Sequence, residues 1–136
     1  MGGASLILLD THVLVWAVAE PQRLSRSASA AIHRGRQEGG LGVAAITLWE
    51  LAVLFARGHL RAPGTVEDSV QSILDRSGVE VRPLTPAIAA LATQFPVDYP
   101  RDPADRLIGA TARAEGLALI TRDEKVRQCR LLNTIW

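Results

Sequence analysis

Short apolar runs alternate along the chain with longer stretches in which apolar residues recur at helical spacing. Continuous apolar runs of four to six residues are typical of strands buried on both faces of a sheet. The run at 79–84 differs, because apolar and polar residues alternate there and Pro83 has no amide proton for a neighbouring strand. We therefore expect it at a sheet edge. The predicted strands are residues 5–9, 41–46, 79–84, 117–120 and 132–136.

The segments between these runs predict helices. In the helix opened by Thr47, apolar residues follow the spacing i, i+3, i+4, i+7 and Gly58 ends the pattern. A further helix starts with Asp102 as N-cap and Pro103 in its first turn. The other predicted helices are residues 11–19, 25–36, 66–77 and 86–93. Strands that alternate with helices predict a three-layer α/β/α fold with a mainly parallel central sheet, and we expect one domain over residues 1–136.

Composition narrows the function classes. The lone Cys129 excludes an intrachain disulfide and a thiolate zinc cluster, and it favours a cytoplasmic protein. The longest apolar stretch, at residues 6–19, is interrupted by polar residues and is too short to span a membrane. Fourteen of the fifteen basic residues are arginine, a composition compatible with phosphate binding but also with coding bias.

Carboxylates follow the predicted strands at several places. Asp10 ends the first strand, Glu50 lies near the start of the helix after the second, and Asp123 follows residues 117–120. Asp102 and Asp105 stand at the start of one helix. Ligands of parallel α/β folds bind beyond the carboxyl ends of the strands, so four segments are expected to bring acids to one sheet edge.

Each of these acids also has a purely structural interpretation. Thr47 and Glu50 have the spacing of a capping box, and the aspartates can cap the helices that follow them. Several carboxylates on one patch repel each other, however, and need a cation or a bound base. Oxygen ligands without cysteine suit Mg²⁺ or Mn²⁺, which favours phosphodiester cleavage.

The sequence leaves the roles of the histidines and tryptophans open. His12, beside Asp10, is interpreted as a structural residue, with a base or a metal ligand as the alternatives. His33 and His59 are expected at the surface. Trp16 and Trp49 lie on apolar helix faces and are expected in the core or in a subunit interface.

Four segments resemble, in order and spacing, the motifs of PIN-domain proteins, and most of all the VapC-type toxins of bacterial type II toxin–antitoxin pairs. The segments are Leu8–Trp16, Ile46–Leu54, Asp102–Ala112 and Leu119–Glu124. The resemblance spans Leu6 to Trp136 and implies a PIN-like fold. One departure is the Gly-Val-Ala-Ala stretch before Ile46, where the family often has serine; no acid is affected.

The resemblance implies a metal-dependent endoribonuclease that uses Mg²⁺ or Mn²⁺, forms a homodimer and is held inactive by a cognate antitoxin. The positions matching the catalytic and metal-binding acids are Asp10, Glu50, Asp105 and Asp123. The supporting residues are Thr11, Asp102 and Thr121. Basic residues that flank the acids in sequence are candidates for RNA phosphate contacts: Arg101, Arg106, Arg122 and Lys125.

Three other functions are alternatives to this one. A haloacid-dehalogenase-like phosphatase needs Asp-x-Asp after the first strand, but Asp10 is followed by Thr11 and His12. A response-regulator receiver needs a later lysine than Lys125. A non-catalytic α/β protein-binding module, in which the acids only cap helices, is the main alternative.

Overall fold

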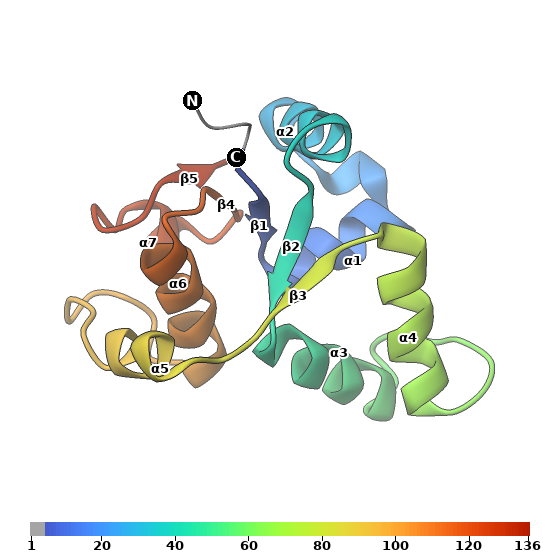
Figure 1. Cartoon of the computed structure of the whole chain (residues 1–136). Coiled ribbons are helices and arrows are strands. Elements are labelled where there is room, and N and C mark those ends of the chain that lie inside the picture. Colours follow the sequence, from blue (N-terminus) through green and yellow to red (C-terminus); the bar gives the residue numbers. More distant parts are fainter. Residues whose placement is uncertain (1–4) are drawn as a thin grey trace.

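One five-stranded parallel sheet forms the centre of the computed structural model, which describes residues 5–136 (Figure 1). Its strands are β1 (Ile7–Leu9), β2 (Leu41–Ala44), β3 (Glu80–Arg82), β4 (Leu119–Ile120) and β5 (Thr134–Ile135). They lie in the order β3-β2-β1-β4-β5, and every neighbouring pair is parallel. The prediction of a mainly parallel sheet is confirmed, and β3 lies at an edge as the position of Pro83 indicated.

The strands are shorter than the apolar runs that predicted them. The run at 41–46 shows the reason. Ala45 already has helical backbone angles, φ −53° and ψ −35°, so the strand ends at Ala44 and the next helix begins at Ile46 rather than Thr47. An apolar run alone does not mark this change, because a buried strand and a buried helix both exclude polar residues.

Helices cover both faces of the sheet. One face carries α1 (Thr11–Ala19), α2 (Arg26–Gln37) and α4 (Val66–Ser77); a 3₁₀ turn, η1 (Pro21–Arg23), follows α1. The other carries α6 (Pro103–Glu115) and α7 (Glu124–Arg127), and α5 (Pro86–Ala92) packs on α6. Helix α3 (Ile46–Ala56) contacts both α4 and α6 (Figure 1). Within residues 5–136 no helix is both long and apolar enough to cross a membrane.

Successive strand residues point into two separate cores. Leu8 and Leu119, each with none of its surface exposed, pack with α6 and α7. Leu9 and Ile120, their neighbours in sequence, pack with α1 and α2 on the opposite face. Because both faces are buried, the central strands are apolar at every position. This arrangement is the three-layer α/β/α architecture that the sequence predicted.

Serine or threonine hydroxyls cap the amino ends of three helices. Ser25 accepts a hydrogen bond from the Ala28 amide at 3.0 Å, and Thr65 and Thr85 do the same for α4 and α5 at 3.0 and 3.2 Å. Each cap stabilises its helix by about 1 kcal/mol. Gly116 ends α6 with φ +63°, a left-handed conformation that glycine adopts without steric strain.

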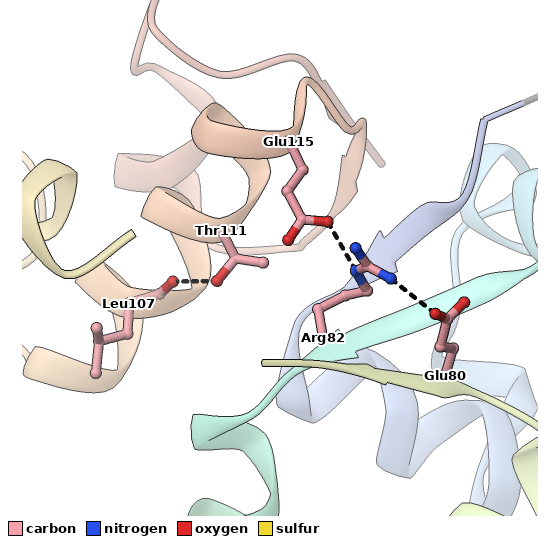
Figure 2. Close-up of polar contacts among 5 residues, drawn as sticks. All are labelled: Glu80, Arg82, Leu107, Thr111 and Glu115. Atoms are coloured by element: carbon pink, nitrogen blue, oxygen red, sulfur yellow. Dashed lines mark hydrogen bonds and ion pairs between the residues drawn. The ribbon is translucent and has the colours of Figure 1, made fainter. Parts of the chain in front are cut away.

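Arg82 joins the edge strand to the end of α6 (Figure 2). Its Nε donates to Glu115 Oε1 at 2.7 Å, and its second guanidinium nitrogen donates to Glu80 Oε1, also at 2.7 Å. In the same view, the Thr111 hydroxyl donates to the Leu107 carbonyl at 2.8 Å within α6. Through Arg82, the sheet edge therefore holds the carboxyl end of the helix whose amino end carries Asp102 and Asp105.

The segment before α6 is held against that helix by aromatic packing. The rings of Phe95 and Tyr99 stack with centroids 4.0 Å apart, and the buried Tyr99 hydroxyl donates to the Asp105 carbonyl at 2.8 Å. Gly109 makes this approach possible, because a methyl group there would overlap the Tyr99 hydroxyl and lie 2.9 Å from Cζ of Phe95. The start of α6 is thus positioned by contacts on two sides.

We expect Gly109→Ala to destabilise the protein even though alanine favours helices. The collision with Tyr99 and Phe95 should outweigh the gain of almost 1 kcal/mol in helix propensity and leave a net loss of about 1–3 kcal/mol. Urea denaturation measures the change. In a Tyr99→Phe background, Gly109→Ala should lower the free energy of unfolding by less than it does in the wild type. A Gly109→Ala protein as stable as the wild type would contradict this account of the packing.

Candidate active site

Five carboxylates from four segments line one cavity of about 410 Å³ beyond the carboxyl ends of β1 and β4. Asp10 directly follows β1, Glu50 comes from α3, Asp102 and Asp105 begin α6, and Asp123 follows β4. The other lining residues are His12, Val13, Trp16 and Arg122. The structure therefore brings the acids that the sequence singled out to one place.

Asp10 ties β1 to the loop after β4. The strand register sets Leu9 beside Ile120, and the Asp10 amide donates to the Ile120 carbonyl at 3.0 Å. The Asp10 carboxylate accepts from the Thr11 amide at 2.7 Å and from the Thr121 hydroxyl at 2.8 Å. The Thr121 oxygen also accepts from the Asp123 amide at 3.1 Å. One threonine therefore fixes two of the acids relative to each other.

Glu50 is held by threonine side chains. The Thr11 hydroxyl donates to Glu50 Oε1 at 2.5 Å, so its oxygen can only accept from the Thr47 hydroxyl, 2.9 Å away. Thr47 is fully buried. The predicted capping box is wrong: Ala45 is the N-cap of α3, and Thr47 and Glu50 bond across the cavity wall to Thr11 instead.

Thr47 is a supporting residue that sequence reasoning assigned to a different role. Its spacing from Glu50 was visible, but that spacing satisfies a local cap and a tertiary contact equally well. The position of Thr11, which is 36 residues away from Thr47 in sequence, distinguishes the tertiary contact from the local cap.

Three of the aspartates do cap helices. Asp10 caps α1, Asp102 caps α6 by accepting from the Ala104 amide at 2.8 Å, and Asp123 caps α7 by accepting from the Val126 amide at 3.1 Å. A carboxylate has about four acceptor positions, so a cap leaves room for a further ligand. The capping interpretation therefore holds for these residues without excluding a second role.

Asp105 differs from these three aspartates. Among residues 5–136, no hydrogen bond reaches its half-buried carboxylate. Burial raises the pKa of Asp105 to about 7, and the nearby charges of Asp10, Asp102, Glu50 and Asp123 add to that effect. Burial also raises the pKa of Asp10 and of Glu50, although hydrogen bonds from Thr121 and Thr11 oppose it.

The donor set fits a hard divalent cation held partly through water. Within residues 5–136, no three acidic, histidine or cysteine side chains are already arranged as a complete coordination shell. The carboxylates nevertheless line one cavity, and the charges of the other four raise the pKa of Asp105. Mg²⁺ is usually bound by one or two carboxylates and keeps several waters, so such a site needs no closed protein cage.

The basic residues predicted to contact RNA phosphates lie in different places in the structure. Arg122 lines the cavity, whereas Lys125 borders a different depression beside Cys129. Arg101 is exposed and Arg106 half-buried, and neither lines the cavity. His12 is exposed at the cavity rim, and His33 and His59 are surface residues as expected.

In open parallel α/β domains, ligands bind beyond the carboxyl ends of the strands, and the carboxylates of this chain cluster there. The PIN domain family model matches residues 7–131. This chain therefore belongs to the PIN domain family, as the resemblance of the four motifs implied.

Similar proteins agree with this assignment. Ribonuclease VapC22 of Mycobacterium tuberculosis is 42% identical over 124 residues, which cover 91% of this chain and 92% of that protein. VapBC2 from Rickettsia felis, solved with a promoter DNA fragment, matches 95% of this chain and 96% of that chain with TM-score 0.71 and 15% identity. DNA-bound VapBC from Salmonella typhimurium matches 96% and 97% with TM-score 0.67 and 16% identity. The two structures support the fold.

We expect the stability of the metal-free protein to fall as pH rises from about 4 to about 7. In this range the folded state keeps a proton on Asp105 that the unfolded chain has released, so deprotonation favours unfolding. Asp105→Asn lacks this carboxyl group. The difference between its free energy of unfolding and that of the wild type should therefore be larger, in favour of the variant, at pH 8 than at pH 5. Urea denaturation in EDTA measures both.

The matched control is Asp98→Asn, an exposed residue outside the cavity. It should keep the pH dependence of the wild type. If Asp105→Asn and the wild type lost stability equally between pH 5 and 8, the elevated pKa of Asp105 would be wrong.

Proposed function

We propose that this chain is a divalent-metal-dependent endoribonuclease and the toxin of a type II toxin–antitoxin pair. The observation that carries the proposal is Asp105, whose half-buried carboxylate lies in a cavity with four others and accepts no hydrogen bond from residues 5–136. Near neutral pH, a proton or a bound cation would stabilise such a group. The ribonuclease name of the 42% identical relative supports RNA as the substrate.

In this proposal Asp10, Glu50 and Asp105 hold Mg²⁺ or Mn²⁺, and Asp123 adjusts the site directly or through water. When bound, such an ion would neutralise charge on the phosphate and lower the pKa of a water molecule, which is the chemistry that phosphodiester hydrolysis needs. Thr11 orients Glu50, and Thr121 orients Asp10 and the loop of Asp123. Asp102 adds negative charge at the rim while capping α6.

A cognate antitoxin is the second proposed partner. The solved structures from Rickettsia felis and Salmonella typhimurium contain VapBC, and this chain matches nearly the full length of one chain in each. We propose an equivalent antitoxin for this chain, and a cytoplasmic location in keeping with its lone cysteine.

A homodimer is the third element of the proposal. Trp49 and Leu84 expose 62% and 56% of their surfaces, although both are large and apolar. They border an apolar depression of about 210 Å³ between α3 and α6. Exposed apolar patches of this kind are typical of protein interfaces. We assign this face to the contact with a second copy.

We expect the purified chain, freed of any bound partner, to cleave cellular RNA into discrete fragments with Mn²⁺. EDTA should abolish cleavage. Asp105→Asn should lower the rate by more than about a hundredfold, because loss of a metal ligand exceeds the 10–100-fold effect of losing a supporting residue. Asp98→Asn should cleave like the wild type. Gel analysis of the fragments measures each rate.

The same preparations separate the enzyme from the non-catalytic binding module. Calorimetric titration with Mn²⁺ should show binding that Asp105→Asn weakens and Asp98→Asn does not. Cleavage retained by Asp105→Asn would refute the assigned site. Absence of both metal binding and cleavage would favour the module in which the acids only cap helices.

We expect the wild type to be a dimer and Trp49→Glu to be a monomer, because a buried charge would oppose association. The control Val97→Glu changes a side chain that is 90% exposed and outside the apolar depression. It should remain dimeric. Sedimentation velocity at several concentrations measures the oligomeric state, and a dimeric Trp49→Glu protein would place the interface elsewhere.

A further inference from the structure

The indole ring of Trp16 forms one wall of the acidic cavity and is surrounded by side chains from other elements. The guanidinium carbons of Arg23 and Arg122 lie 4.6 and 5.8 Å from the ring centroid. The rings of Trp136 and His12 lie at 6.0 and 6.1 Å. Both arginines are within the distance at which an aromatic ring attracts a cation.

The position of Arg122 needs an explanation, because five carboxylates line the same cavity. Within residues 5–136, Arg122 makes no ion pair within 4.0 Å and no side-chain hydrogen bond. Its neighbours in sequence are fixed, since Thr121 donates to Asp10 and Asp123 caps α7. The backbone thus delivers Arg122 to the cavity, where its guanidinium lies over the indole ring and more than 4.0 Å from the carboxylate oxygens of residues 5–136.

An arginine kept in this way retains all its guanidinium donors. The planar guanidinium matches two oxygens of a phosphate, and a charge-assisted pair of this kind is stronger than a neutral hydrogen bond. Arg23 adds a second positive charge on the same ring. Its only ion pair within residues 5–136 is an exposed one with Glu20 at 3.6 Å, which contributes little. We call these two arginines, together with the indole ring that lines the acidic cavity, the cationic patch.

The ring itself is a poor platform for an RNA base. Trp16 exposes only 8% of its surface, because these neighbours cover it. A stacked base needs an open aromatic face. The chemistry of the patch therefore fits a phosphate better than a base.

We infer that Trp16 is a positioning residue that holds Arg122, with Arg23 beside it, to bind an RNA phosphate next to the one that is cleaved. This inference rests on the proposed nuclease function. It separates Arg122 from Arg101, Arg106 and Lys125, which do not line the cavity. It also predicts the path of the RNA strand, which would leave the acidic cavity over α1 and η1.

The test compares Arg122→Gln with Arg36→Gln. Arg36 carries the same charge but lies in α2, close to the amino end of β2, whereas the cavity lies beyond the carboxyl ends of the strands. Binding of a fluorescein-labelled single-stranded RNA is measured with Mn²⁺ in an Asp105→Asn background over a range of salt concentrations. Arg122→Gln should weaken binding about tenfold and lower the salt slope by about 0.7. Arg36→Gln should change neither. In the cleaving protein, Arg122→Gln should raise KM more than it lowers kcat.

The role of Trp16 is tested by a double-mutant cycle. Trp16→Leu should weaken RNA binding as Arg122→Gln does, and the double variant should be no worse than either. If Trp16→Leu fails to fold, Trp16→Phe replaces it; the loss from Arg122→Gln should then be smaller than in the wild-type background, because a phenyl ring attracts a guanidinium less than an indole does.

The outcomes keep the two proposals apart. Two outcomes would overturn the inference and leave the nuclease intact. One is metal-dependent cleavage with RNA binding that Arg122→Gln does not change. The other is a double variant whose loss of RNA affinity equals the product of the losses in the two single variants. Arg122-dependent RNA binding without any cleavage would support the phosphate contact and overturn the nuclease. RNA that neither binds nor is cleaved would overturn both.

Discussion

The Asp10 carboxylate holds two distant parts of the chain together, and the candidate site depends on this contact. It accepts from the Thr11 amide, which starts α1, and from the Thr121 hydroxyl, which follows β4, 111 residues away from Asp10. Thr11 in turn donates to Glu50, and Thr121 accepts from the Asp123 amide. The parallel pairing of β1 with β4 makes this contact possible, because it places both strand ends side by side.

The same closeness opposes folding. Burial and mutual repulsion raise the pKa of Asp10, Glu50 and Asp105, so each costs free energy when it is ionised. Contacts elsewhere hold the acids in place despite this. Tyr99 binds the backbone of Asp105, and Arg82 attaches the far end of α6 to β3 (Figure 2). Folding energy from the two cores thus maintains a concentration of negative charge that a divalent cation would relieve.

Much of the fold was predictable because its signals are local. The apolar runs predict the strands, and Ser25, Thr85 and Asp102 each cap the helix expected to follow them. The errors occur where a local pattern has two explanations. Thr47 and Glu50 have capping-box spacing, yet their hydrogen bonds go to Thr11. The strand predicted through Ile46 ends at Ala44, because burial continues from strand into helix without a change in polarity.

By itself the sequence determined the alternation of elements, the parallel sheet and the set of acids that follow its strands, since each depends on residues close together along the chain. Only the tertiary structure decided how these groups differ. Within the part of the chain that the structure describes, the Asp105 carboxylate accepts no hydrogen bond, and Thr47 supports Glu50 through Thr11. Of the four basic candidates, Arg122 lines the cavity, with its guanidinium over the ring of Trp16. These differences arise from contacts between segments that only the packing of the sheet brings within hydrogen-bonding distance.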